Sequence, residues 1–331
     1  MIDPGLYNAF VDSAPQGSLF HKTWWLDAVA KNGYTILSIE KNGQLLAAWP
    51  ITQKKTAGLK LLIQPQLTPR LGILIAPSQK ARYAESLSDE MKLISGLIAK
   101  LPGHSLFCQR FSPGFSNWLP LYWAGFKQTT RYTYVLDDLS DINKLWENLR
   151  YNTKRKIKKA VSHGIKIVSD LSLDKLLDLN ELTYKRQKLA LPYSRDYVRQ
   201  IDEACMEHGA GKKLFAVDGD GRIHAAAYIV YDKKAAYYLI GGADPGLNTF
   251  GAHYLTLWEA IKFASGVSQS FDFEGSMHRS IEPVFRSFGG IQKSYMEITG
   301  GTLLMRSAFD AFRSAWNKGG LVSKISGCLI S

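Results

Sequence analysis

The residues best suited to chemistry lie in the segment FDFEGS, where Asp272 and Glu274 alternate with Phe271 and Phe273. On an extended strand, this alternation places both carboxylates on one face and both rings on the other. Because an unpaired buried carboxylate is costly, we expect these acids to reach solvent, a cation or a cleft. A partly dehydrated carboxylate has a raised pKa and can take a proton from an ammonium or hydroxyl nucleophile.

A glycine-bearing passage, YYLIGGADPGLNTFGAHYL, leads from a predicted strand into a predicted helix. Such a loop points backbone N–H groups and the positive end of the helix dipole at whatever lies before the helix, commonly a phosphate. The residues placed to form this cradle are Gly246, Asn248, Gly251 and Ala252. The alternative interpretation is that the glycines only permit a turn.

Arg286 follows Phe285 in the segment IEPVFRSFGG. Its forked donors can grip a phosphate or stabilise a developing oxyanion. The alternative is an ion pair with an acid such as Asp272 or Glu274, either of which can instead cap the next helix. Two tyrosines, Tyr238 and Tyr254, are candidate donors to a leaving group.

A basic run precedes these segments and carries six cations in ten residues. These are Arg150, Lys154, Arg155, Lys156, Lys158 and Lys159. The run is either a solvated helix face or a stripe that binds RNA or phosphate and loses affinity as salt rises. Tyr184 and Arg186 on the following predicted helix extend it as candidate substrate-binding residues. Trp25 is a further substrate-binding candidate, with packing in the core as its alternative.

Composition indicates an ordinary globular chain, with 331 residues of which 46% are hydrophobic and 21% charged. That length favours two domains. The balance of 41 basic and 29 acidic residues gives a net charge of +12 and predicts an anionic partner. Nucleic acid, an acidic lipid surface and a phosphate-bearing small molecule all remain open.

Several common catalytic patterns are missing from the sequence. It contains no GxxxxGK[ST], GxGxxG or HExxH motif, and its three cysteines form no metal spacing. We therefore expect no metal, and the isolated cysteines fit a reducing compartment. The start MIDPGLYNAFVDS lacks the features of a signal peptide, and no run approaches the ~18 apolar residues of a membrane span. The expected location is cytoplasmic.

Periodicity predicts an α/β chain with mixed sheets. In the first part, it predicts helices at 23–33, 79–100 and 117–126, a hairpin at 34–51 and a strand at 104–111. In the second part, it predicts helices at 141–164, 172–190, 197–208, 251–264 and 281–290, with strands at 132–138, 165–170, 235–244, 270–276 and 293–298, and a hairpin at 213–230.

The two parts share one pattern. At an offset of 178 residues, ILSIEKNGQLLAAWPI aligns with LFAVDGDGRIHAAAYI. The turn Asn42-Gly43 falls on Asp220-Gly221, and alternating apolar positions coincide. Asx-Gly turns recur in many hairpins, so the match can also arise without common origin. Because both parts also begin with a helix, we predict a duplicated domain.

Taken together, FHKTWWLDAV, RYNTKRKIKKAVSHGIKI and FDFEGSMHRSIEPVFRSFGG resemble the FemAB/FemX-like branch of the GNAT acyltransferase superfamily, in particular its BioF2-like acetyltransferases. The resemblance covers residues 18–300 and implies two tandem GNAT-like domains, each a mixed, mostly antiparallel sheet flanked by helices. We expect these domains at 1–130 and 131–300, the second being the active one, and an amphipathic helix or tail at 301–331.

The resemblance also implies an activity, the transfer of an acyl or aminoacyl group to an amine of a cell-envelope sugar or peptide precursor. Acyl-CoA is the expected co-substrate, with no tightly bound cofactor. Asn248, Gly251 and His253 match part of the GNAT CoA loop, and Arg286 takes the place of a lysine in an FKxxFG-like motif that helps hold the donor. The alternatives are an aminoacyl-tRNA-dependent ligase and a non-catalytic protein that binds RNA or an anionic glycan carrier.

The C-terminal segment GGTLLMRSAFDAFRSAWNKGG spaces apolar residues at helical intervals between cations. The apolar set is Leu304, Ala308, Phe309, Phe312 and Trp316. Such a helix can lie on an anionic membrane, at the inner face where lipid-linked precursors are found. The alternative is that it docks on its own domain, as most amphipathic surface helices do.

Overall fold

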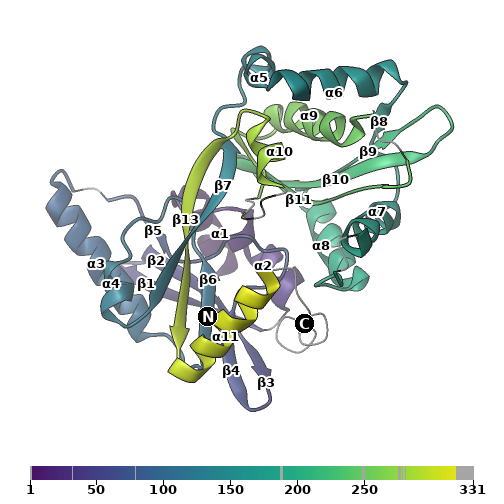
Figure 1. Ribbon diagram of the computed structural model, residues 1–331. Helices are drawn as coiled ribbons and strands as arrows, with labels where there is room; N and C mark the ends of the chain where they lie inside the picture. The colour runs from purple at the N-terminus through teal and green to yellow at the C-terminus, as the bar shows by residue number, and fades with distance from the viewer. Residues whose placement is uncertain are drawn as a thin grey trace. The chain divides into compact units, whose positions relative to one another are not determined.

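The computed structural model describes residues 2–31, 33–78, 80–186, 189–247, 250–274, 277, 279 and 281–317 (Figure 1). Backbone contacts divide the chain into unit 1, Met1–Arg131 with Ser294–Ser331, and unit 2, Tyr132–Lys293. The predicted domain 131–300 runs past this division, which places residues 294–300 in unit 1. The full extents of the two predicted domains stay a prediction.

Unit 1 is a mixed α/β unit. Its helices are α1 (Pro4–Ser13), η1 (Leu19–His21), α2 (Thr23–Ala30), α3 (Tyr83–Ala99), α4 (Leu119–Trp123) and α11 (Leu303–Asn317). Its strands are β1 (Tyr34–Lys41), β2 (Gln44–Thr52), β3 (Lys54–Thr56), β4 (Leu59–Ile63), β5 (Leu74–Ile75) and β6 (Leu106–Arg110). The chain passes between the units within β7 (Lys127–Leu136) and β13 (Ile291–Gly301). Pairing is antiparallel in β1–β2, β2–β5, β3–β4 and β6–β13, and parallel in β4–β6.

Unit 2 is built on the strand order β7-β12-β11-β10-β9-β8. The further strands are β8 (Lys166–Val168), β9 (Gly211–Val217), β10 (Ile223–Tyr231), β11 (Ala235–Ala243) and β12 (Ser270–Asp272). The helices are α5 (Ile142–Asn148), α6 (Tyr151–Ser162), α7 (Leu173–Arg186), α8 (Arg195–Glu207), α9 (Ala252–Ser265) and α10 (Glu282–Arg286). Only β11 and β12 pair in parallel among these described strands. The predicted mixed, mostly antiparallel sheet is confirmed.

Helices cover both faces of the unit 2 sheet, with α6 and α9 on one face and α7 and α8 on the other (Figure 1). On the α6–α9 face, alternate residues of β10 pack against α9. Ala225, Ala227 and Ile229 are buried in the same core as the apolar residues of that helix. On the opposite face, α7 approaches β11 closely. A Cβ on Gly242 would lie 2.4 Å from the backbone carbonyl carbon of Leu179.

The predicted helix at 141–164 is two helices. Asp141 caps α5 through its side chain, as expected, but Leu149 and Arg150 are extended, with ψ of 139° and 143°. Arg150 N–H donates to the Ser287 carbonyl at 3.0 Å, a contact distant in sequence that interrupts the helix. The basic run therefore forms a separate helix, α6, which ends before Gly164 at a φ of 75°.

Both units repeat one order of elements, an antiparallel hairpin followed by a parallel strand pair joined through a helix. In unit 1 these are β1–β2 and then β4-α3-β6, with β3 and β5 as additional strands and with the hairpin and the parallel pair in separate sheets. In unit 2 they are β9–β10 and then β11-α9-β12, all in one sheet. Ala47 and Ala48 in β2 are fully buried, as are Ala225 and Ala226 at the aligned positions in β10. This order is the one expected of two related domains.

Candidate active site

The parallel pair β11–β12 is short and leaves part of β11 without a neighbour on that side. The pairing covers Ala235↔Ser270, Ala236↔Phe271 and Tyr237↔Asp272, and β12 then ends while β11 continues to Ala243. A register shift in the β10–β11 ladder, opposite Tyr228/Ile229, also marks a bulge at Leu239, between Tyr238 and Ile240. The edge of β11 beyond Tyr237 (the free β11 edge) therefore has no strand neighbour on that side among the described residues. Side chains of α7 bond two backbone groups of this segment, because Asn180 Nδ2 donates to the Gly241 carbonyl and the Ala243 N–H donates to Thr183 Oγ1.

The next helix in the chain, α9, follows the end of β11 after eight intervening residues, and its N-terminus has no side-chain cap. Gly251 adopts a left-handed φ of 99° there, and a Cβ on it would lie 2.4 Å from the carbonyl oxygen of Lys156 in α6. The first N–H groups of a helix lack intrahelical acceptors and carry the positive end of its dipole. Since α9 has no acid in its first turn, this end favours an anion.

The helix α6 adds cations to the same place. Lys156 Nζ donates to the Tyr254 hydroxyl at 2.9 Å and lies 4.1 Å from the centre of its ring. Lys159 Nζ lies 5.5 Å from the ring of Phe250, which stacks on His163 at 4.1 Å. Because α6 contains no acidic residue, the loop before α9 sits in a positive environment.

His253, in the first turn of α9, is a neutral group at physiological pH. Burial, with a further contribution from the charge of Lys156, lowers the pKa of His253 to about 4. Its ring centre lies 6.4 Å from that of Tyr238 and 6.0 Å from that of Tyr254. A neutral imidazole adds no positive charge at this helix N-terminus, but its ring N–H is still a hydrogen-bond donor.

Asp272 does not reach solvent as predicted. It is 2% exposed, and its Oδ1 accepts hydrogen bonds from the Thr133 hydroxyl and, at 2.9 Å, from the Glu274 N–H. The predicted strand at 270–276 ends at Asp272, and Phe271 and Phe273 both lie in the core with ring centres 5.0 Å apart. The two rings therefore share one face, as the alternation predicts, whereas the strand is shorter than expected and Asp272 is buried, where it fixes the turn that carries Glu274.

Glu274 follows β12 in a left-handed conformation with a φ of 57°. Only glycine adopts this region without cost, and such strain in other residues concentrates at functional sites. The side chain of Glu274 is partly buried. Because it comes two residues after the last β11–β12 pair, it stands where the two strands cease to be neighbours.

Arg286 has an acidic partner, as its alternative interpretation held, but that partner is Glu282. Arg286 Nε lies 2.6 Å from Glu282 Oε1, which also accepts a hydrogen bond from the Tyr134 hydroxyl at 2.5 Å. The hydrogen bond from Arg286, followed by that from Tyr134, lowers the pKa of the Glu282 carboxyl. The role of Arg286 in holding a donor stays a prediction.

The two candidate tyrosines lie in the same core region. Burial raises the pKa of Tyr238, whose ring also contacts Phe285 at 6.1 Å. Tyr254 stacks on Phe288 at 5.9 Å while its hydroxyl meets Lys156. Tyr238 thus retains its phenolic proton and is able to donate it.

The remaining predicted site residues lie in the loop before α9, at the start of α9 and on α7. Gly246 N–H donates to Asp244 Oδ1 at 2.7 Å, and Ala252 is the buried first residue of α9. Asn248 lies outside the described residues. Tyr184 is partly buried on α7, whereas Arg186 is exposed at the end of that helix.

Trp25 belongs to the core of unit 1, and its assignment to substrate binding is wrong. Its side chain is fully buried, and its indole N–H donates to the Thr68 hydroxyl at 3.0 Å. Its ring packs edge-on against Phe20 at 4.9 Å. With its one polar group bonded inside the core, the residue has no surface to offer a ligand.

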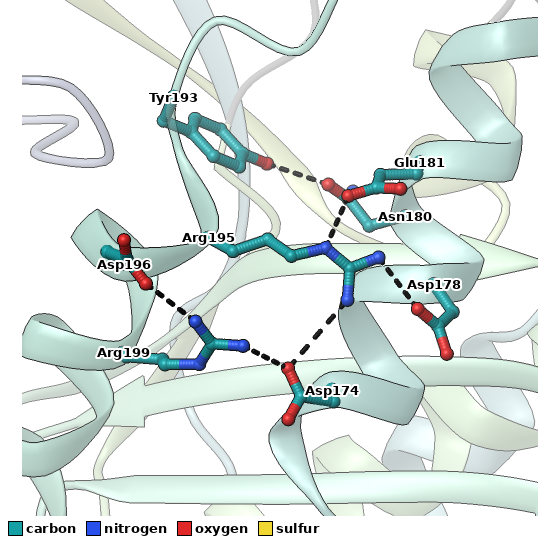
Figure 2. A network of polar contacts seen from close by, with 8 residues as sticks. All are labelled: Asp174, Asp178, Asn180, Glu181, Tyr193, Arg195, Asp196 and Arg199. Carbon is teal, nitrogen blue, oxygen red and sulfur yellow. Dashed lines mark hydrogen bonds and ion pairs between the residues drawn. The ribbon is translucent and has the colours of Figure 1, made fainter.

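Sequence reasoning missed two residues on the α7–α8 side, Asn180 and Tyr193 (Figure 2). Asn180 is 4% exposed; its Nδ2 donates to the Gly241 carbonyl at 2.9 Å, and its Oδ1 accepts from the Tyr193 hydroxyl at 3.0 Å. The only sequence signal is a polar amide on the apolar face of a helix. Within the described ranges, no group of three His, Cys, Asp or Glu side chains is placed to hold a metal.

Comparison with known proteins identifies one domain and a fold. Residues 147–276 match the model of an acetyltransferase (GNAT) domain. The chain resembles the crystal structure of FemX with a TM-score of 0.67 and 14% identity, over 89% of this chain and 96% of that one. No curated protein matches the sequence.

Two further structures have the same fold at 11% identity. L-PGS from Bacillus licheniformis gives a TM-score of 0.52, and the C-terminal domain (DUF2156) of a putative lysylphosphatidylglycerol synthetase from Agrobacterium fabrum gives 0.53. Each comparison covers 96% of this chain and 97% of the other. The FemX-like GNAT fold expected from the sequence is confirmed, and the GNAT domain confirms the acyltransferase class.

Proposed function

We propose that this chain is an N-acyltransferase that moves an acyl group from acyl-CoA to an amine, using a site within unit 2. The observation that carries the proposal is the uncapped N-terminus of α9, flanked by the cations of α6 and following the free β11 edge in the chain. An elongated donor with phosphates at one end and a thioester at the other fits this arrangement. Its phosphates would meet the α9 N–H groups and Lys156.

The chemistry assigned to the site is a simple transfer. The amine nitrogen attacks the thioester carbonyl, forming a C–N bond while the C–S bond breaks. Glu274 accepts the proton that the amine loses, directly or through water, and Tyr238 or Tyr254 donates a proton to the departing thiolate. Asp272 is assigned a positioning role, because its carboxylate is occupied by Thr133 and by the N–H of Glu274.

The acceptor is proposed to be an amine of a cell-envelope sugar or peptide precursor. The fold shared with FemX and with a lysylphosphatidylglycerol synthetase supports envelope chemistry, and polysaccharide biosynthesis is one pathway that fits. We place the protein in the cytoplasm, in contact with the inner membrane face through α11. Leu303 and Leu304 on that helix are 73% and 78% exposed, which suits contact with an anionic lipid surface. Among the described helices, none is long and apolar enough to cross a membrane.

Calorimetric titration of the purified chain with acetyl-CoA tests the donor assignment. Saturable binding is expected, and Lys156→Ala should weaken it about tenfold, since a charged hydrogen bond to phosphate is worth roughly 1.5–3 kcal/mol. Lys158→Ala is the matched control, because Lys158 is an exposed cation of the same helix with no hydrogen bond or ring contact to the described residues of the α9 loop. Absence of saturable binding, or an equal effect of both variants, would contradict the proposal.

A second candidate donor is an aminoacyl-tRNA, favoured by the exposure of Arg155, Lys158 and Lys159 along α6. A polyanion that contacts several of these cations would dissociate steeply as salt rises, whereas a single CoA molecule would respond weakly. Titrations with tRNA and with acetyl-CoA at two salt concentrations therefore separate the two donors. If tRNA binds with a steep salt dependence, and neither CoA binding nor acyl transfer is detected, the result would instead favour a non-catalytic protein that binds RNA or a glycan carrier.

A further inference from the structure

A groove lies at the edge of the unit 2 sheet, between α9 and the strands β8 and β9 (Figure 1). Its volume is about 390 Å³. It is lined by residues 167–169 of β8 and the position after it, by two residues of β9 and by three residues in the last two turns of α9. All of them belong to unit 2, and we refer to this space as the edge groove.

The edge groove exists because β8 stops before β9 does. The last pair between the two antiparallel strands is Val168↔Phe215. The first four residues of β9, Gly211–Leu214, therefore have no strand on that side among the described residues. An unpaired strand edge presents N–H and C=O groups, so the groove offers backbone hydrogen-bonding groups to a ligand.

The floor of the edge groove is apolar. Leu214 is 5% exposed and belongs to the core that β9 shares with α9, whereas Ile167, Val168 and Phe263 are only half-buried. The ring of Phe263 packs edge-on against Tyr231 at 5.2 Å, which fixes its position in the groove. Half-buried apolar side chains are stabilised when an apolar group covers them, so the floor favours a ligand with an apolar body.

Lys212 supplies a positive charge in this apolar setting. Its Nζ lies 5.5 Å from the centre of the Phe263 ring, and it forms no ion pair with a described residue. The next residue of β9, Lys213, lies on the opposite face of the sheet, where its Nζ is 2.6 Å from Asp202 Oδ1 of α8. Of these two neighbouring lysines, Lys212 is thus the one whose ammonium is available to an anion.

The lining as a whole carries one net positive charge. Lys262 Nζ lies 2.7 Å from Glu259 Oε1, so these two charges cancel and the charge of Lys212 remains. The charged residues that flank the β8 part of the lining, Lys166 and Asp170, are both exposed and also cancel each other. A ligand with a single negative charge is therefore the one that complements the groove.

We propose that the edge groove is a second ligand site, which takes a small carboxylate with an apolar body. The carboxylate meets the Lys212 ammonium, and the unpaired N–H groups of β9 and the exposed Ser169 hydroxyl are further donors to it. The apolar body covers Phe263 and Val168.

This site goes beyond the proposed acyl transfer, because it lies away from the donor site. The strands β9, β10 and β11 separate the groove from the free β11 edge. Along α9, Lys262 is about 15 Å from the first residue, Ala252, at the helix end assigned to the donor's phosphates. The two sites can therefore be occupied by different molecules.

Saturation-transfer NMR of the full chain with 4-phenylbutyrate tests the proposal, with 4-phenylbutylamine as the cationic analogue of the same body. The wild-type chain should bind the carboxylate about tenfold more tightly than the amine. Lys212→Met removes the ammonium but keeps the apolar stem, so it should weaken carboxylate binding about tenfold, whereas Lys212→Arg should retain it. Lys166→Met is the matched control, because Lys166 is an exposed cation of β8 outside the lining.

A second variant and a competition experiment keep the inference falsifiable. Ser169→Trp places a bulky ring at an exposed position of the lining and should also weaken binding, which serves if Lys212→Met unfolds. The inference is overturned if 4-phenylbutyrate does not bind, binds no better than the amine, or binds equally well to Lys212→Met. Displacement of 4-phenylbutyrate by acetyl-CoA would also overturn it, since the probe would then occupy the donor site. Because the probe requires no acyl donor, loss of either proposal leaves the other standing.

Discussion

Substitution of Gly251 by alanine probes the contact between α6 and α9 on which the donor site depends. The new Cβ would lie 2.4 Å from the Lys156 carbonyl oxygen, where ordinary contact begins at 3.4 Å, so one backbone must withdraw by about 1 Å. A non-glycine residue in the left-handed region costs a further ~1–2 kcal/mol. With ~1–3 kcal/mol for the overpacked contact, we expect the free energy of unfolding to fall by about 2–5 kcal/mol.

Urea denaturation followed by circular dichroism measures this loss, and calorimetry with acetyl-CoA measures the accompanying change in affinity. We expect the dissociation constant to rise at least tenfold, because Lys156 moves away from the α9 N-terminus. Gly246→Ala is the stability control, since its Cβ would meet only the Asp244 side chain at 3.2 Å. The reasoning is refuted if Gly251→Ala is as stable as that control and binds acetyl-CoA like the wild-type chain.

Three further outcomes follow from the site. Glu274→Gln should lower kcat/KM for acyl transfer by about 10²–10⁴ without shifting the unfolding midpoint; an unchanged rate would remove Glu274 as the base. Asp272→Asn should cost about 1–3 kcal/mol of stability as well as activity, because it disturbs a buried, doubly bonded carboxylate; a stable but inactive variant would argue against a positioning role. The imidazole NMR signals of His253 should not titrate between pH 8 and 5. Because the unfolded chain binds this proton first, the free energy of unfolding should decline between pH 6.5 and 4, by at most ~1.4 kcal/mol per unit; a midpoint near 6.5 would contradict its burial.

Local signals predicted much of the fold. The Asn42-Gly43 turn has φ of 53° and 74°, as the hairpin requires, and Asp141 caps its helix as expected. The predicted helix starting at Thr23 and the hairpin at 213–230 are also confirmed. In each case the residues that determine the element lie within a few positions of it, so the sequence carries the whole signal.

The predictions that failed depend on contacts distant in sequence. Asp272 bonds to Thr133, which is 139 residues away, and that bond lies in the region where the expected strand ends. Trp25 looked like a ligand-binding aromatic until its partner Thr68 placed it in the core. Asn180 could not be identified from the sequence, because its side-chain amide is bonded to Gly241 and Tyr193, which only folding brings next to it. No periodicity marks such pairs, so the candidate site was predicted in outline but not in its supporting contacts.

Backbone strain gives an independent reason to place the chemistry at the end of β12. Among the described residues of unit 2, Phe250 and Glu274 are the non-glycine residues with left-handed φ, at 45° and 57°, and they come just before α9 and just after β12. Each such residue costs roughly 1–3 kcal/mol unless its surroundings hold it there. His163 stacks on Phe250, and Asp272 accepts the N–H of Glu274, so both conformations are held by specific contacts.

If the function of Glu274 depends on its carboxylate and not on its backbone conformation, glycine at this position should give a more stable protein. We expect Glu274→Gly to exceed Glu274→Gln in free energy of unfolding by about 1 kcal/mol, because relief of the left-handed strain outweighs the added freedom of the unfolded chain. Both variants should lose acyl transfer equally. Chemical denaturation of the two variants side by side measures the difference, and a glycine variant no more stable than the glutamine one would show that the turn is unstrained.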